Sequence, residues 1–199
     1  MKSFVEKIIW YLPIGGKLSQ SFEGEDILLW RLFTDLGIKD GFFIDVGAFH
    51  PVQYNNTWVL RKRLGFRGIN IEPSEKGFKQ FKWRKGDITL RCLCGDTNGE
   101  EWYLYNREEP TLSKTGMKGV KMPMRTLETI CVAYGVKKID LLSIDVEGNE
   151  LSVLEGHNWE IRPKVIICEI NDRTTDLLIR QKGYEIYGKT KRNGIYIDA

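Results

Sequence analysis

The chain has 199 residues, enough to bury the core of one domain, and its 42% hydrophobic and 29% charged residues are typical of a globular protein. Its net charge of +3 is too small, and its basic residues too dispersed, to indicate nucleic-acid binding. No stretch reaches the ~20 consecutive apolar residues that span a bilayer, so we expect no integral membrane segment.

The first predicted element is an N-terminal helical arm over residues 1–20, which stops at Pro13 and the two glycines after it. Its apolar part is too short for a secretory signal. The next helix is predicted over 27–33 and ends at Gly37. The four cysteines all lie in apolar stretches, which indicates buried, reduced thiols in a cytoplasmic protein. They are Cys92, Cys94, Cys131 and Cys168.

A buried strand is predicted over Gly41–Val46, and a sharp turn follows at Gly47. The acidic Asp45 at the end of such a strand lies at the mouth of an α/β sheet, where these folds bind ligands. Gly47 would let a ligand approach the backbone closely. Asp45 would repel a pyrophosphate but would suit a ligand with an ammonium and a sulfonium, such as S-adenosylmethionine. The alternative that needs no ligand is an ordinary Asp-x-Gly turn.

The rest of the chain alternates between predicted helices and strands. Further helices are expected over 54–64, 78–82, 126–134, 150–154 and 174–182. Further strands are expected over 68–73, 87–94, 101–105 (at an edge), 139–144 and 165–170, and a final hairpin pairs 184–187 with 194–197. The pattern predicts an α/β fold with a mainly parallel, doubly wound sheet and an antiparallel C-terminal hairpin, in one domain over 1–199.

Residues 106–120 have no periodicity and are predicted to form a long mobile loop. We expect this loop to close over the acceptor, because closure would exclude water and help to position the reacting groups.

Three predicted strands end in acids, namely Asp45, Glu72 and Asp145. Glu72 comes 25 residues after Gly47, the place from which a carboxylate accepts hydrogen bonds from both ribose hydroxyls of a bound nucleotide. Nicotinamide enzymes use the same position, but the Gly-x-Gly-x-x-Gly pattern is absent, so the residues favour S-adenosylmethionine. Asp96 could accept from the adenine amino group, or simply belong to a Gly-Asp-Thr-Asn turn.

Several segments resemble the FkbM-type methyltransferases. They are Phe43–Pro51, Asn55–Thr57, Gly68–Pro73 and Leu142–Glu150, and Ser19–Gln20 with Gly24–Asp26 resembles the family's N-terminal segment. The block Asp-Val-Glu-Gly-x-Glu at 145–150 is the most specific part. The resemblance implies a class I methyltransferase (Rossmann-like) fold, S-adenosylmethionine as cofactor, and transfer of a methyl group to an oxygen of a sugar or related natural product.

The resemblance also implies positions for the site. Asp45 and Gly47 would hold the methionine part of the cofactor, Glu72 the ribose and Asp96 the adenine, while Asp145 would lie beside the reacting methyl. With their neighbours, the implied cofactor-binding residues are Asp45, Gly47, Ala48, Glu72, Pro73 and Asp96. The sequence departs from the family's commoner pattern at Phe49-His50-Pro51, where that pattern has a second glycine.

A sugar hydroxyl is a poor acid, so a base is expected near the methyl. The candidates at strand ends are His50, Asp145, Glu147 and Glu169. His50 titrates near neutrality, although a lone histidine after a strand is also a common structural hydrogen-bonding residue. An alternative role for Glu147 is to cap the helix that carries Glu150. Three carboxylates could bind a divalent metal with oxygen ligands, but the sequence has no ligand spacing that demands one, and we assign no metal-binding residues.

These observations predict an S-adenosylmethionine-dependent O-methyltransferase that acts on a hydroxyl of a sugar, glycan or related natural product. One alternative is a dinucleotide-dependent oxidoreductase, and another is a non-catalytic glycan-binding subunit that retains the fold. The expected partner is a small-molecule or saccharide acceptor, without nucleic acid, and a homodimer is left open as an assembly. The expected location is the cytoplasm.

Overall fold

The computed structural model describes residues 19–104, 114–115 (backbone only) and 119–199. Its helices are α2 (Glu25–Asp35), α3 (Trp58–Leu64), α4 (Glu75–Gln80), the 3₁₀ turn η1 (Phe81–Trp83), α5 (Leu127–Ala133), α6 (Glu150–Glu155) and α7 (Arg173–Gln181). Within these ranges no helix is long and apolar enough to cross a membrane. The expected N-terminal arm lies outside the described residues, apart from 19–20.

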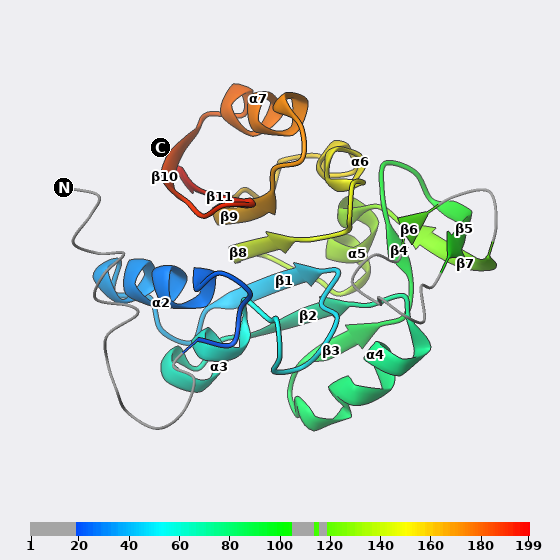
Figure 1. Cartoon of the computed structure of the whole chain (residues 1–199), viewed down its shortest axis with the longest axis horizontal. Helices are drawn as coiled ribbons and strands as arrows, with labels where there is room; N and C mark the ends of the chain where they lie inside the picture. Colours follow the sequence, from blue (N-terminus) through cyan, green and yellow to red (C-terminus); the bar gives the residue numbers. More distant parts are fainter. Residues whose placement is uncertain (1–18, 105–113, 116–118) are drawn as a thin grey trace.

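A seven-stranded sheet forms the centre of the molecule (Figure 1). Its strands are β1 (Phe42–Val46), β2 (Arg67–Ile71), β3 (Ile88–Leu90), β8 (Ile139–Ile144), β9 (Pro163–Glu169), β10 (Tyr184–Lys189) and β11 (Asn193–Asp198). The spatial order is β10-β11-β9-β8-β1-β2-β3, in which the neighbours from β9 to β3 pair in parallel and β11 is antiparallel to β9 and β10. This order confirms the predicted α/β fold with its antiparallel C-terminal hairpin.

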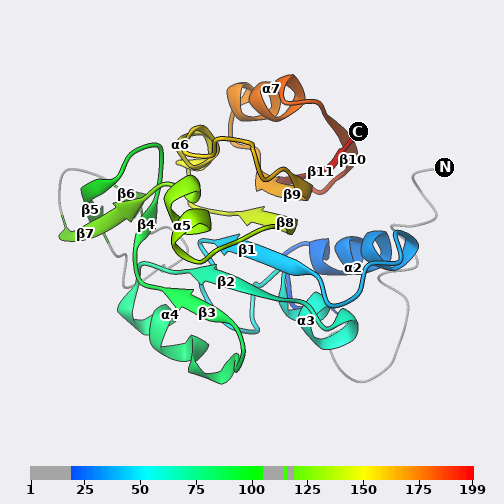
Figure 2. The ribbon, with the colours of Figure 1, turned by 180° about the vertical axis from the view of Figure 1, so that it is seen from behind.

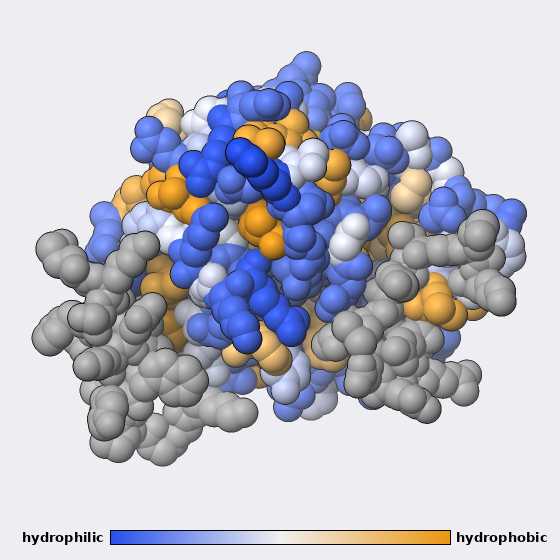
Figure 3. Space-filling view, turned by 45° about the horizontal axis from the view of Figure 1, so that its top comes forward, coloured by the Kyte–Doolittle hydropathy of each residue, from blue (hydrophilic) through white to orange (hydrophobic). Residues whose placement is uncertain are grey.

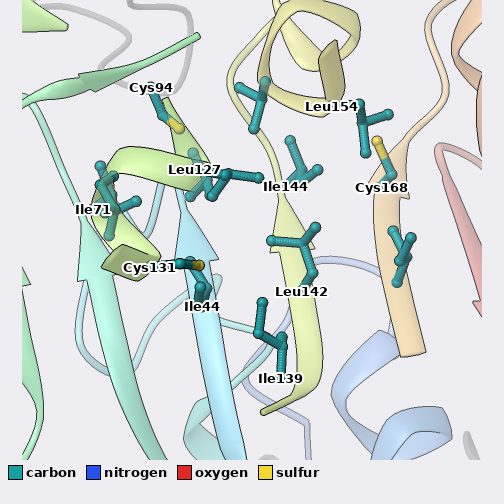
Figure 4. Close-up of a cluster of buried hydrophobic side chains, with 14 of the residues drawn as sticks. Ile44, Ile71, Cys94, Leu127, Cys131, Ile139, Leu142, Ile144, Leu154 and Cys168 are labelled. Atoms are coloured by element: carbon teal, nitrogen blue, oxygen red, sulfur yellow. The ribbon is translucent and has the colours of Figure 1, made fainter. Parts of the chain in front are cut away.

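The two faces of the sheet are covered by different helices, and Figure 2 shows the arrangement from behind. Side chains alternate along each strand, so Phe43 and Leu141 pack with α2 and α3, whereas Ile44 and Leu142 pack with α5, α6 and α7. Figure 4 shows the second cluster, in which Leu127 of α5 and Leu154 of α6 lie against the strands. All four cysteines are buried and free, as predicted. The surface in Figure 3 is mostly hydrophilic, with separate apolar patches.

A second, four-stranded sheet was not predicted. Its strands are β4 (Leu93–Cys94), β5 (Gly99–Leu104), β6 (Lys114–Thr115) and β7 (Val120–Arg125), in the order β4-β7-β5-β6. The prediction of one strand over 87–94 is therefore wrong, because the chain leaves the large sheet after Leu90 and β4 pairs with β7 instead. A strand does form near 101–105, as β5, but the prediction that it lies at the edge of a sheet is wrong, because β5 lies between β7 and β6.

Two further expectations are corrected. The helix predicted over 54–64 begins only at Trp58, because Asn55 and Thr57 turn their side chains into a buried polar cluster instead of continuing a helix. The loop predicted over 106–120 lies mostly outside the described residues, and so does its predicted closure over the acceptor. Its described backbone at 114–115 and Val120 is part of β6 and β7, not of a loop.

Candidate active site

The carboxyl ends of β1, β2, β8 and β9 meet at one edge of the large sheet, and each end carries an acid. Asp45 is the fourth residue of β1, Glu72 follows β2, Asp145 follows β8 and Glu169 ends β9. The direction of the strand order reverses between β1 and β8, and ligands of open α/β sheets bind at such a switch point. The structure thus brings four of the predicted site residues to the place where a ligand site is expected.

Asp45 is buried, with 4% of its surface exposed. One carboxylate oxygen, Oδ2, accepts hydrogen bonds from Asn55 Nδ2 and Thr57 Oγ1, each at 3.0 Å. Burial raises the pKa of Asp45, and the positive charge of Arg84 opposes that rise. Asp45 therefore anchors the segment between β1 and α3, and this segment forms one wall of the site.

Arg84 is a buried cation that the sequence analysis missed. Its guanidinium donates from Nε and Nη2 to the Pro51 carbonyl oxygen at 3.0 and 2.7 Å, and from Nη1 to Thr57 Oγ1 at 2.8 Å and Asn70 Oδ1 at 3.1 Å. Burial lowers the pKa of Arg84 to about 10, so the side chain stays charged at neutral pH. Nη1 also lies 3.9 Å from Asp87 Oδ2. Arg84 thus holds the same wall in place, and its positive charge favours the ionised form of Asp45.

Gly47 lies where the turns after β1 and β8 cross. Its φ is +78°, and a Cβ at this position would come within 1.8 Å of the carbonyl oxygen of Asp145. The backbone amides of Gly47 and Ala48 both donate to the Ile71 carbonyl oxygen, at 3.0 and 3.1 Å. Glycine is therefore required here by the packing of two turns, a reason additional to the close approach of a ligand.

Glu72 is buried after β2, with 5% of its surface exposed. Its carboxylate accepts from the amides of Phe49 at 2.9 Å and Ser74 at 2.8 Å, so it links the β1 turn to the N-terminus of α4 through the half-buried Pro73. Burial raises the pKa of Glu72 against these hydrogen bonds. The Ser74 side chain is a third hydrogen-bonding partner of Glu72. Because a carboxylate has about four acceptor positions, one remains for a hydroxyl donor of a ligand.

His50 is held by its own turn. The Nδ1 atom accepts from the amides of Val52 at 3.1 Å and Gln53 at 2.9 Å, and burial lowers the pKa of the ring. A neutral imidazole with an accepting Nδ1 carries its proton on Nε2, where it can donate but cannot take up a proton. This geometry favours the structural role over the role of general base.

The turn 145–150 follows β8 and carries two acids, Asp145 and Glu147, while a third acid, Glu150, holds its backbone in place. Glu150 is buried, and its Oε1 accepts from the amides of Val146 at 3.1 Å and Gly148 at 3.0 Å. Glu147, which lies between Val146 and Gly148, adopts a φ of +57°, a backbone conformation that is unfavourable for residues other than glycine. In the sequence Glu150 is recognisable only as part of the motif at 145–150, and its hydrogen bonds to the amides of this turn are seen only in the fold.

Asp145 and Glu147 sit in a crowded, negatively charged setting. Desolvation by the surrounding protein and repulsion from Glu169, Glu147 and Glu150 hold the pKa of Asp145 well above its usual range, although the residue as a whole is exposed. Desolvation and the charges of Glu169 and Glu150 raise the pKa of Glu147 to about 7. Glu147 can therefore exchange a proton near neutral pH, and neither acid is buried, so both remain open to a ligand.

The two remaining predicted residues lie in different surroundings. Glu169 is buried at the end of β9, where its Oε2 accepts from Asn171 Nδ2 at 3.0 Å. Asp96 follows β4 of the small sheet; it is exposed, and its amide donates to Ser152 Oγ of α6 at 3.0 Å. Glu169 thus belongs to the acidic edge, whereas Asp96 comes from the adjoining sheet.

This edge of the sheet offers negative charge and hydrogen-bond acceptors. Within the described ranges no group of three His, Cys, Asp or Glu side chains is arranged to hold a metal ion. The open carboxylates suit a ligand that carries positive charge and hydroxyl donors.

The comparison with protein families gives one result. A family model described as the methyltransferase FkbM domain matches residues 45–186, well over half of the chain. The matched region begins at Asp45 and contains the acidic edge described above. No curated protein matches the sequence.

Proposed function

The chain belongs to the FkbM methyltransferase domain family, and from this premise we propose that it transfers a methyl group from S-adenosylmethionine to a hydroxyl of a saccharide. The class I methyltransferase fold is present in the order of the seven strands. The observation that carries the proposal is the set of carboxylates from β1, β2, β8 and β9 around the switch point. Free, buried cysteines support a reducing, cytoplasmic setting.

The residues at the edge fit S-adenosylmethionine better than a dinucleotide. The carboxylates complement an ammonium and a sulfonium, and Glu72 retains an acceptor position for a ribose hydroxyl. A pyrophosphate needs free backbone amides and a helix N-terminus. The amides of Gly47 and Ala48 are already bonded to Ile71, and α3 begins eleven residues after Gly47, at Trp58. This arrangement disfavours the oxidoreductase alternative.

For the chemistry, S-adenosylmethionine when bound supplies an electrophilic methyl carbon on a sulfonium. The chain must align the acceptor oxygen with that carbon and take the hydroxyl proton as the oxygen–carbon bond forms and the sulfur–carbon bond breaks. Asp145 and Glu147 are the acids best placed for this work, because they are accessible, their pKa values are raised, and that of Glu147 is about 7. We assign the proton transfer to this pair, with Glu169 behind them.

The other charged residues of the site have positioning roles in this proposal. Asp45 and Arg84 hold the wall between β1 and α3, and Glu150 holds the turn that carries the reacting pair. Asp96 is assigned to the adenine, to which it would reach from the small sheet. The carboxylates at the edge also disfavour an anionic acceptor, which supports a neutral hydroxyl compound.

Calorimetric titration of the full chain with S-adenosylhomocysteine and, separately, with NAD tests the proposal. We expect S-adenosylhomocysteine to bind in about the micromolar range and NAD to give no heat of binding. A chain that bound NAD more tightly than S-adenosylhomocysteine would contradict the proposal. Asp40→Asn is a suitable control variant, because Asp40 precedes β1 at the opposite end of the strand and should leave both titrations unchanged.

A further inference from the structure

Three aromatic rings form a row beside the acidic edge. The ring centroids of Phe49 and Tyr54 are 6.3 Å apart, and those of Tyr54 and Phe22 are 5.8 Å apart. The guanidinium of Arg192, on the turn between β10 and β11, lies 5.2 Å from the centre of the Phe22 ring. Phe22 and Tyr54 are 65% and 55% exposed. We call Phe22, Phe49, Tyr54 and Arg192 the aromatic row.

Both ends of the aromatic row are tied to the candidate active site. At one end the amide of Phe49 donates to Glu72, the acid assigned to the ribose. At the other end the charge of Arg192 lowers the pKa of Glu147, which places the cation near the acid assigned to proton transfer. The row therefore extends from the cofactor side of the site to the side where the proton is removed.

Hydrogen bonds join the segments that carry the rings to one another. The segment that carries Phe22 is joined to the wall of the site by a hydrogen bond from the Asn55 amide to the Gln20 carbonyl oxygen at 3.3 Å. The same segment is joined to the hairpin turn, because Glu23 Oε2 accepts from the Arg192 amide at 3.1 Å. The exposed rings thus belong to three parts of the chain that the fold fastens together.

The backbone under two of the rings is strained. Phe49 and Tyr54 adopt φ of +54° and +53°, which bulky residues rarely do. His50 stabilises the turn between them, since its Nδ1 accepts from two amides of that turn. The surrounding contacts keep this strained backbone in place, and the Tyr54 ring is exposed to solvent as a result. Strained backbone of this kind is typical of ligand sites.

We propose that the aromatic row is the acceptor subsite and stacks one neutral pyranose ring, an inference that rests on the proposed function. The C–H face of a pyranose packs on aromatic rings, while its hydroxyls need polar groups at the rim. Arg192 and Glu147 supply a donor and an acceptor at that rim. The stacked ring would direct one hydroxyl toward the reacting pair.

The test measures binding of three probes, the methyl glycosides of β-D-galactose, β-D-glucose and α-D-mannose, to the full chain saturated with S-adenosylhomocysteine. Saturation-transfer NMR gives the dissociation constants, and calorimetry gives the affinity for S-adenosylhomocysteine in each variant. We expect Phe22→Ala and Tyr54→Ala to weaken binding of the accepted glycoside about fivefold or more. Tyr54→Phe keeps the ring and should retain binding. Tyr134→Ala removes an exposed aromatic beside α5, on the other face of the sheet, and should change nothing.

Each other result overturns the inference. Wild-type chain that binds S-adenosylhomocysteine but none of the three glycosides would remove the subsite and leave the proposed function standing. Unchanged glycoside affinity in both alanine variants would do the same. Loss of S-adenosylhomocysteine affinity in these variants, with glycoside binding intact, would assign the rings to the cofactor. Wild-type chain without affinity for S-adenosylhomocysteine would refute the proposed function itself, and this inference with it.

Discussion

Replacing Arg84 by methionine should destabilise the protein more than any surface charge change. Methionine keeps an unbranched apolar stem among Phe43, Trp58 and Phe81, whose rings surround the guanidinium, so the loss is mainly that of the charge and its hydrogen bonds. The carbonyl of Pro51 loses two donors. Asp87 loses Arg84 at 3.9 Å but retains Arg61 at 3.2 Å, whereas Asp45 loses the positive charge that opposes its raised pKa.

The magnitude follows from this count of lost partners. Arg84 forms a buried ion pair with Asp87, with Nη1 3.9 Å from Oδ2, and its positive charge also acts on Asp45. Removal of one partner from a buried ion pair costs about 3–5 kcal/mol, because the other charge stays buried with less compensation. For a chain of this length each kcal/mol lowers the melting temperature by about 2–4 °C, which gives a fall of about 6–20 °C. The pKa of Asp45, already raised by burial, should rise further without Arg84. A carboxyl group whose pKa is higher in the folded protein than in the unfolded chain destabilises the fold fully at pH values above its folded pKa. This cost vanishes at pH values below its unfolded pKa, so the stability difference between Arg84→Met and wild type should shrink in acidic buffer.

Urea denaturation at neutral and at mildly acidic pH measures both effects. Arg84→Lys keeps the charge but loses the planar fork of donors, and should fall between wild type and Arg84→Met. Arg31→Met removes a cation from an exposed pair with Asp35 on α2 and should change stability little. An Arg84→Met variant within about 1 kcal/mol of wild type would refute the reasoning, because it would mean that Asp45 does not depend on this cation.

Three further predictions concern the site. Asp145→Asn keeps the shape and should lower turnover of an accepted saccharide about 10²–10⁴-fold while S-adenosylhomocysteine affinity changes less; near-normal turnover would remove Asp145 from the chemistry. Because only ionised Glu147 accepts a proton and its pKa is about 7, kcat/KM should fall as the pH drops through that value, and Glu147→Gln should abolish this limb of the profile. Glu72→Ala should weaken S-adenosylhomocysteine binding about tenfold to a hundredfold in calorimetry, and unchanged affinity in a folded variant would contradict the ribose assignment.

The large sheet could be predicted from the sequence because its strands are short apolar runs that end at glycines or acids. Residues 139–144, for example, match β8 at both ends. The same local signals were enough to place Asp45, Glu72 and Asp145 at one edge, since parallel strands present their carboxyl ends together.

The small sheet could not be predicted in this way, because its order depends on pairing between distant segments. Leu93 of β4 lies opposite Met124 of β7, and no local pattern joins them. Pro123 also makes residues 120–125 look unlike a strand within a sheet, although Met122 and Met124 alternate toward a small core.

Arg84 was missed for a related reason. It stands among Lys82, Trp83 and Lys85, which looks like an exposed basic turn. Only the fold shows that Arg84 points inward to Pro51 and Thr57 while its neighbours remain in solvent. The hydrogen-bond partners of Arg84, such as Pro51 and Thr57, lie far from it in the sequence, so local sequence patterns cannot identify them.

A crystal structure of the full chain with S-adenosylhomocysteine bound tests the central claim most directly. The account predicts that the ribose hydroxyls lie within hydrogen-bond distance of Glu72 and that the sulfur faces Asp145 across the switch point between β1 and β8. A nucleoside bound away from this edge, or one with its ribose turned from Glu72 and its sulfur turned from Asp145, would contradict it.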